Sequence, residues 1–126
     1  MTEKRIFSVV YIEDNEANRL LVELVLARRD NIRLFAAPTG QSGLAKVREI
    51  LPDLILLDIS LPDMTGYAVL NALRQDPATA KIPAIAVSGE YPPVMPRDSP
   101  FTFDRYLRKP IELPPLFQAI DDFLPG

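Results

Sequence analysis

The sequence predicts one α/β domain in which a parallel sheet is covered by helices on both faces. Short apolar segments rich in β-branched residues alternate along the chain with segments whose apolar residues recur at helical spacing. Most of the predicted strands are apolar at every position, which is typical of strands buried on both faces. The 126 residues, 48% of them apolar, are enough for one core, and no linker or repeat interrupts them. We therefore expect a single domain over residues 1–126.

The first half of the chain predicts three strands and two helices. The strands are short and apolar, and they cover Ile6–Ile12, Ile32–Ala36 and Leu54–Leu57. The helices cover Glu16–Arg29 and Gly40–Ile50. The apolar residues at helical spacing in the first helix are Leu20, Leu21, Leu24 and Val25. Asn15 and Thr39 directly precede the two helices and are suitable N-caps.

The second half predicts two further strands and two further helices. The strands cover Ala84–Val87 and Asp104–Leu107. The helices cover Gly66–Arg74 and Pro115–Phe123, and a proline in the first turn suits the second of them.

One segment interrupts the alternation. Where a helix is due between the fourth and fifth strands, residues 89–103 read GEYPPVMPRDSPFTF. Each proline inside a helix costs about 3 kcal/mol, and this segment contains Pro92, Pro93, Pro96 and Pro100. We therefore expect that helix to be shortened or absent and the segment to form a surface loop.

The composition excludes several classes of function. The chain contains no histidine and no cysteine, which excludes a Ser-His-Asp triad, a histidine or cysteine zinc site and a disulfide framework. A net charge of −3 without a basic block argues against nucleic-acid binding. The sequence shows no signal-peptide pattern and no apolar run long enough to span a bilayer, so we expect a cytoplasmic protein without membrane contact.

Polar residues follow four of the five predicted strands. Glu13 and Asp14 follow the first strand, Asp58 the third, Ser88 the fourth and Lys109 the fifth. Ligands of open parallel sheets bind at the carboxyl ends of the strands, so these side chains are expected to lie together. Three neighbouring carboxylates repel one another unless a cation offsets their charge, and Mg²⁺ is the usual cation with oxygen ligands. Each residue alone also fits an ordinary role, such as a helix cap or a solvated strand end.

Four motifs carry a resemblance to a known family. They are VVYIEDN (residues 9–15), LILLDISLPDMTG (54–66), AIAVSG (84–89) and YLRKP (106–110). In order and spacing they resemble a response-regulator receiver domain over essentially the whole chain. The resemblance implies a flavodoxin-like three-layer fold with strand order 2-1-3-4-5.

The resemblance also implies a role for each site residue. Asp58 would be the phosphoacceptor, a carboxylate nucleophile that takes a phosphoryl group from a histidine kinase or a histidine phosphotransfer protein. Mg²⁺ would be bound by Glu13, Asp14, Asp58 and the backbone carbonyl of Ser60. Lys109 would pair with the phosphoryl oxygens, Ser88 would hydrogen-bond the phosphoryl group, and Tyr106 would change its side-chain orientation in response. The Lys109–Pro110 peptide bond would be cis.

Three functions remain open at this point. The first is a phosphorylatable receiver that acts on a protein target and catalyses only its own phosphorylation and dephosphorylation. The second is a receiver-like binding module that works without phosphate through the proline-rich segment 89–103. The third is a Mg²⁺-dependent phosphatase with Asp63 as a second acid, although the chain has no room for a cap over the substrate. Loss of the helix within 89–103 makes dimerisation through the usual family surface doubtful, so we expect a monomer or a weak dimer.

Overall fold

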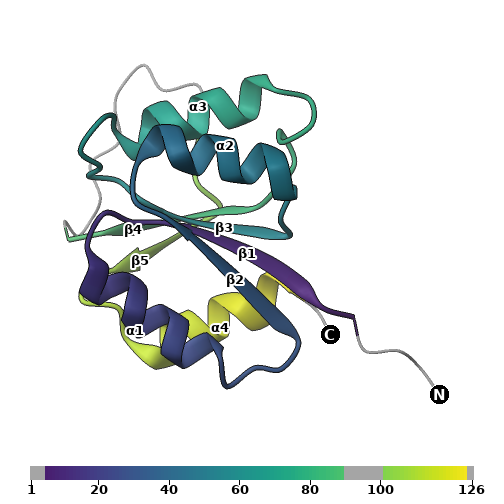
Figure 1. Ribbon diagram of the computed structural model, residues 1–126, viewed down its shortest axis with the longest axis vertical. Helices are drawn as coiled ribbons and strands as arrows, with labels where there is room; N and C mark the ends of the chain where they lie inside the picture. The colour runs from purple at the N-terminus through teal and green to yellow at the C-terminus, as the bar shows by residue number, and fades with distance from the viewer. Residues whose placement is uncertain (1–4, 90–100, 125–126) are drawn as a thin grey trace.

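The computed structural model describes residues 5–89 and 101–124 and contains a five-stranded parallel sheet (Figure 1). The strands are β1 (Phe7–Ile12), β2 (Ile32–Ala37), β3 (Leu54–Asp58), β4 (Ala84–Ser88) and β5 (Arg105–Arg108). Their order in the sheet is β2-β1-β3-β4-β5, and every pairing is parallel. The expected flavodoxin-like strand order is therefore confirmed.

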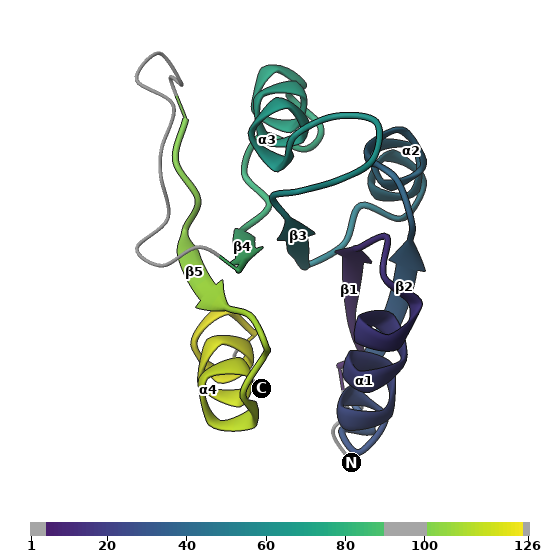
Figure 2. The same cartoon turned by 90° about the vertical axis from the view of Figure 1, so that its left-hand side faces the viewer.

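Helices cover both faces of this sheet. Those in the described residues are α1 (Glu16–Leu26), α2 (Gly40–Ile50), α3 (Gly66–Gln75) and α4 (Leu113–Phe123). Figure 1 shows α1 and α4 on one face and α2 and α3 on the other, and Figure 2 shows the three layers nearly end-on. Within the described ranges, no helix is long and apolar enough to cross a membrane.

The core consists of two apolar layers that meet at the sheet. Alternate residues of a strand point to opposite faces, so Tyr11 contributes to the layer beneath α1 and α4 while Ile12 contributes to the layer beneath α2 and α3. The central strands β3 and β4 are buried at every position, which explains their continuous apolar sequences. These two buried strands carry Asp58 and Ser88 at their ends.

The first three helices, α1, α2 and α3, begin where the sequence predicts. The side chain of Asn15 accepts a hydrogen bond from the Asn18 amide, and Thr39 forms a reciprocal capping box with Ser42. Thr65 caps α3 in the same way by accepting from the Ala68 amide. The predicted caps Asn15 and Thr39 are confirmed.

Some boundaries differ from the predictions. The first helix ends at Leu26 and not at Arg29, and β5 begins one residue later than expected. The last helix begins at Leu113, two residues before the expected Pro115. The α1 shift arises because caps and side-chain patterns locate a helix better than they locate its last turn. The start of α4 was misplaced because its N-cap residue, Glu112, makes no side-chain cap hydrogen bond and so gives no capping signal.

The inward face of α1 also differs from the leucine pattern. Leu20, Leu21 and Leu24 are 48%, 43% and 71% exposed, whereas the buried residues are Val22, Val25 and Leu26. The helix carries more apolar residues than one face can bury, so the leucine spacing predicted the helix but not its orientation.

The proline-rich prediction falls largely outside the described residues, which omit 90–100. The described parts of that segment, Gly89 and Phe101–Phe103, form neither helix nor strand.

Candidate functional site

The carboxyl edge of the sheet brings three acidic residues together. Because β1 and β3 pair with Ile12 opposite Leu57, the next residue of each strand places Glu13 beside Asp58. A carboxylate oxygen from each of Glu13, Asp14 and Asp58 lies within 4.8 Å of the other two. The sequence-based expectation that these side chains meet at one edge is correct.

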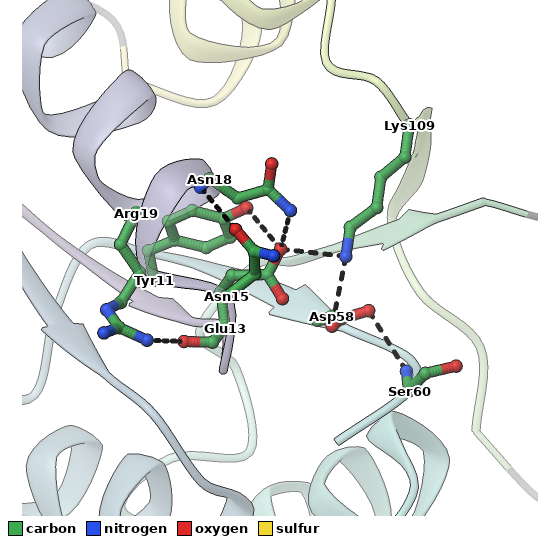
Figure 3. A network of polar contacts seen from close by, with 8 residues as sticks. All are labelled: Tyr11, Glu13, Asn15, Asn18, Arg19, Asp58, Ser60 and Lys109. Carbon is green, nitrogen blue, oxygen red and sulfur yellow. Dashed lines mark hydrogen bonds and ion pairs between the residues drawn. The ribbon is translucent and has the colours of Figure 1, made fainter. Parts of the chain in front are cut away.

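Lys109 lies between the two buried acids (Figure 3). Its Nζ atom is 2.8 Å from Glu13 Oε1 and 3.1 Å from Asp58 Oδ2. Glu13 is fully buried, Asp58 is 3% exposed, and Asp14 is exposed at the rim. One ammonium group therefore serves two buried carboxylates, which leaves an excess of negative charge.

The pKa values follow from this arrangement. Burial, followed by the interaction with Glu13, raises the pKa of Asp58 to about 7, against the lowering effects of the Ser60 amide and Lys109. Burial alone would also raise the pKa of Glu13, but the neighbouring Asp58 carboxyl group, Lys109 and Asn18 hold it below its usual range. Burial opposes the charge on Lys109, yet the two carboxylates raise the pKa of its ammonium group. The site thus strongly favours added positive charge.

Glu13 is fixed at both its backbone and its side chain. Its amide donates to the Ala37 carbonyl at 2.9 Å, and its carbonyl accepts from Arg19 Nη1 at 2.7 Å. Its Oε1 atom accepts from Asn18 Nδ2 at 2.7 Å and from the Tyr11 hydroxyl at 3.3 Å, in addition to Lys109. Burial, followed by the charges of Glu13 and Asp58, raises the pKa of Tyr11, so this hydroxyl remains a neutral donor.

The other carboxylate oxygen of Glu13 supports a metal site. Glu13 Oε2 is buried and makes no hydrogen bond in the structure. A buried carboxylate oxygen without a partner is costly, and it lies in the one group of three acidic residues found with metal-binding spacing among the described residues. The oxygen-only donor set formed with Asp14 and Asp58 fits a hard cation such as Mg²⁺.

The loop after Asp58 is held at three points. The Ser60 amide donates to Asp58 Oδ1 at 3.1 Å, so Ser60 contacts the phosphoacceptor candidate through its amide. The Gly66 amide donates to the Ile59 carbonyl at 2.7 Å, and a Cβ atom at Gly66 would lie 2.8 Å from the Asp58 carbonyl oxygen. Only glycine allows this close approach. The carboxylate of Asp63 accepts from the Gly40 and Gln41 amides at 2.8 and 2.9 Å, which fastens the loop to the start of α2.

Ser88 and Tyr106 lie on the side of the site toward β5. Ser88 is buried at the end of β4, one residue beyond the partner of Asp58 in the sheet register, and its carbonyl accepts from the Lys109 amide at 2.8 Å. Tyr106 is partly buried, and its ring packs edge-on against Phe103 with centroids 5.7 Å apart. The Lys109–Pro110 bond is cis, as the resemblance implied.

Sequence reasoning missed Tyr11, Asn18 and Arg19, which hold Glu13. A weak signal was available, because Asn18 lies one turn beyond the cap Asn15 at the end of α1 nearest Glu13. Whether such a residue faces the site depends on how the helix is rotated against the sheet, and spacing alone does not give this rotation.

This fold and this acidic edge together define a receiver-type domain. Comparison of the chain with known proteins leads to the same conclusion. The sequence pattern of the response regulator receiver domain matches residues 9–121, so the chain belongs to this family. The polar-differentiation response regulator DivK of Brucella ovis is 34% identical over 122 residues, a match that covers 93% of this chain and 95% of DivK.

Solved structures share the fold. A chemotaxis protein of Vibrio cholerae superimposes with a TM-score of 0.82 at 22% identity, covering 94% of this chain and 99% of that one. The receiver domain of a sensor histidine kinase from Pseudomonas aeruginosa, which has a magnesium ion coordinated in its active-site cleft, superimposes with a TM-score of 0.80 at 22% identity. That match covers 96% of this chain and 99% of the kinase receiver domain.

Other relatives are considerably longer. The chain spans 25% of a protein-glutamate methylesterase/protein-glutamine glutaminase of Myxococcus xanthus and 34% of a transcriptional regulatory protein of Streptomyces coelicolor, at 34% and 38% identity over 70% and 64% of this chain. Receiver domains of this family therefore occur both nearly alone, as in DivK, and as part of larger proteins.

Proposed function

We propose that this receiver domain is a phosphoacceptor that takes a phosphoryl group onto Asp58 and thereby regulates a protein target. The observation that carries the proposal is the buried Asp58 carboxylate, which lies beside Lys109 and within reach of Glu13 and Asp14. A buried carboxylate fixed at the end of a strand is well placed to act as the nucleophile. The surrounding groups can bind a cation and a phosphoryl group.

The reaction is the transfer of phosphorus from nitrogen to oxygen. The donor is a phosphohistidine of a histidine kinase or a histidine phosphotransfer protein. That histidine lies outside the present sequence, which contains none. A carboxylate oxygen of Asp58 forms a bond to phosphorus while the P–N bond of the donor breaks, and the imidazole nitrogen keeps the electron pair. When bound, Mg²⁺ supplies the positive charge that offsets the phosphoryl oxygens.

The residues of this chain bind the cation, bind the phosphoryl group and respond to the modification. Glu13, Asp14, Asp58 and the Ser60 carbonyl would hold the cation. Lys109 pairs with a phosphoryl oxygen, and Ser88 donates a hydrogen bond to the modified group, which draws the β4 end toward Asp58. Tyr106 responds because its ring packs beside Phe103, next to that strand end. We assign the chain no reaction beyond its own phosphorylation and dephosphorylation.

The donor protein docks on the exposed leucines of α1. Leu20, Leu21 and Leu24 lie on one side of this helix, and exposed apolar groups of this kind mark interaction surfaces. The same helix contacts the site directly, because Asn18 and Arg19 bind Glu13. A Leu24→Glu variant is expected to slow transfer from a phosphorylated donor protein while leaving labelling by a small phosphodonor unchanged.

The proposal is tested with acetyl phosphate and Mg²⁺. Intact mass measurement should show one added phosphoryl group on the unmodified protein, none without Mg²⁺, and none on Asp58→Asn. If neither acetyl phosphate nor a donor protein labels the chain, and beryllium fluoride does not perturb its spectra, the phosphate-independent binding module becomes the better explanation.

The phosphatase alternative is disfavoured by the position of Asp63. This carboxylate, the second acid that such a reaction would need, already accepts two amide hydrogen bonds at the start of α2. Turnover of small phosphate esters by catalytic amounts of the protein would revive that alternative.

A further inference from the structure

We propose that Asn18, assisted by Tyr11, is a positioning residue that reserves Glu13 Oε2 for the cation. The proposal rests on the function proposed above, because it concerns the same Mg²⁺ site. Its basis is the unequal treatment of the two Glu13 oxygens, which Figure 3 shows from close by.

The two oxygens have opposite surroundings. Oε1 accepts from Asn18 Nδ2, from the Tyr11 hydroxyl and from Lys109 Nζ, whereas Oε2 is buried with no hydrogen bond. The donors come from three separate parts of the fold, namely α1, β1 and the turn after β5. Since three donors converge on Oε1, rotation of the carboxylate would break several bonds at once.

The backbone of Glu13 is also held by hydrogen bonds, so only its side-chain bonds remain free to rotate. The Ala37 carbonyl and Arg19 bind the Glu13 amide and carbonyl at 2.9 and 2.7 Å. A glutamate side chain has three rotatable bonds, so without Asn18 its carboxylate could turn and present either oxygen to the cation. Partners outside the coordination shell commonly orient a metal-binding side chain in this way.

Because Asn18 and Tyr11 also donate to Glu13, Lys109 can leave Glu13 and interact with the phosphoryl group. Lys109 contacts both Glu13 and Asp58, and in the proposed reaction it must turn toward the phosphoryl group. When it leaves Glu13 Oε1, the neutral donors of Asn18 and Tyr11 remain, so this buried oxygen is never without a partner. The roles are ordered by geometry, because the Asn18 contact at 2.7 Å is shorter than the Tyr11 contact at 3.3 Å.

The test is a double-mutant cycle between Asn18 and Glu13, read out as Mg²⁺ affinity by calorimetric titration. Asn18→Ala should weaken Mg²⁺ binding about tenfold in the protein that retains Glu13. In a Glu13→Ala background, the same substitution should change the affinity less than about twofold, since there is no carboxylate left to position. Asn18→Gln keeps the donor group and should recover part of the loss, and Tyr11→Phe should show a smaller loss than Asn18→Ala.

Asn71→Ala serves as the matched control. Asn71 lies on α3, outside the site, and its substitution should leave the Mg²⁺ affinity unchanged. Circular dichroism of each variant shows that the sheet and helices are retained, and Tyr11→Phe provides a second, nearly isosteric probe if Asn18→Ala folds poorly.

The outcomes separate this inference from the proposed function. If the unmodified protein binds Mg²⁺ and Asn18→Ala binds it equally well, the positioning role is overturned while the phosphoacceptor proposal stands. Equal losses in the Glu13 and Glu13→Ala backgrounds would also overturn it, because they would show that Asn18 does not act through Glu13. If the unmodified protein binds no Mg²⁺, both proposals fail.

Discussion

Acidic residues at the two edges of the sheet are treated differently. At the amino edge, Asp53 accepts from Arg5 and from the Ser8 amide, each at 2.9 Å, and it remains partly exposed. Asp104 accepts from the Ala84 amide at 2.8 Å and from Arg74 at 3.3 Å. At the carboxyl edge, Glu13 and Asp58 are buried and share Lys109. At the amino edge, the acidic residues form hydrogen bonds and ion pairs that link neighbouring segments. At the carboxyl edge, the acidic residues outnumber the cations, and a positively charged ligand can offset the excess negative charge.

Lys109→Met should produce the largest effect. Removing the shared ammonium group leaves two buried carboxylates without a cation, which is expected to cost about 3 kcal/mol of unfolding free energy at pH 8 without Mg²⁺. Urea denaturation with and without saturating Mg²⁺ measures this, and Mg²⁺ should restore part of the loss. Equal stability of this variant and the unmodified protein would show that Lys109 does not offset an energetic cost of burying the two carboxylates.

Arg74→Met should produce a comparable or slightly smaller loss at the amino edge. Arg74 Nη1 donates to the carbonyls of Thr79, Ala80 and Ile82 at 3.4, 3.1 and 2.8 Å, besides the ion pair with Asp104. Losing these contacts is expected to cost about 2 kcal/mol, with no dependence on Mg²⁺. A Mg²⁺-dependent loss would contradict the separation of the two edges.

Asp58→Asn should stabilise the protein at pH 8 without Mg²⁺. The folded-state pKa of Asp58 is raised to about 7 from 3.8, so between these values the folded protein holds a proton that the unfolded chain has released. The contribution of Asp58 to stability therefore falls as the pH rises through this window. We expect a gain of about 2 kcal/mol at pH 8, less than the full shift would give because surrounding groups relax.

Thermal unfolding in a chelating buffer at pH 8 and pH 5 checks this prediction. The gain should fall to about a third at pH 5, where the folded protein keeps the Asp58 proton but most unfolded chains have already released it, and it should also shrink in Mg²⁺. A gain of the same size at both pH values would show that its origin is not the buried charge.

Asp53→Asn should have the smallest effect. The amide side chain can still accept from the Ser8 amide, and the exposed ion pair with Arg5 contributes little. The expected loss is about 0.5 kcal/mol by urea denaturation at low salt, decreasing at high salt. A loss above that of Arg74→Met would reverse the order assigned to the amino edge.

Much of the fold follows from local patterns in the chain. Continuous apolar strands predicted burial on both faces, and Asn15 and Thr39 located two helix starts. The meeting of Glu13, Asp14 and Asp58 also followed, because parallel strands end at one edge. The orientation of α1 and its Asn18 contact did not follow, since they depend on which residues the opposing sheet can accommodate. The functional roles of Ser88 and Tyr106 remain predictions.

The charge balance at the carboxyl edge also sets an order of events. When all three carboxylates are ionised, as they are above the Asp58 pKa of about 7, one ammonium group leaves the cleft with a formal charge of −2. A phosphorylated donor brings further negative charge, so the bare cleft repels it, whereas a cleft that has first taken up a divalent cation is neutral. In the proposed reaction, cation binding before donor engagement is thus the favoured order, and the availability of the cation would limit phosphorylation independently of the donor.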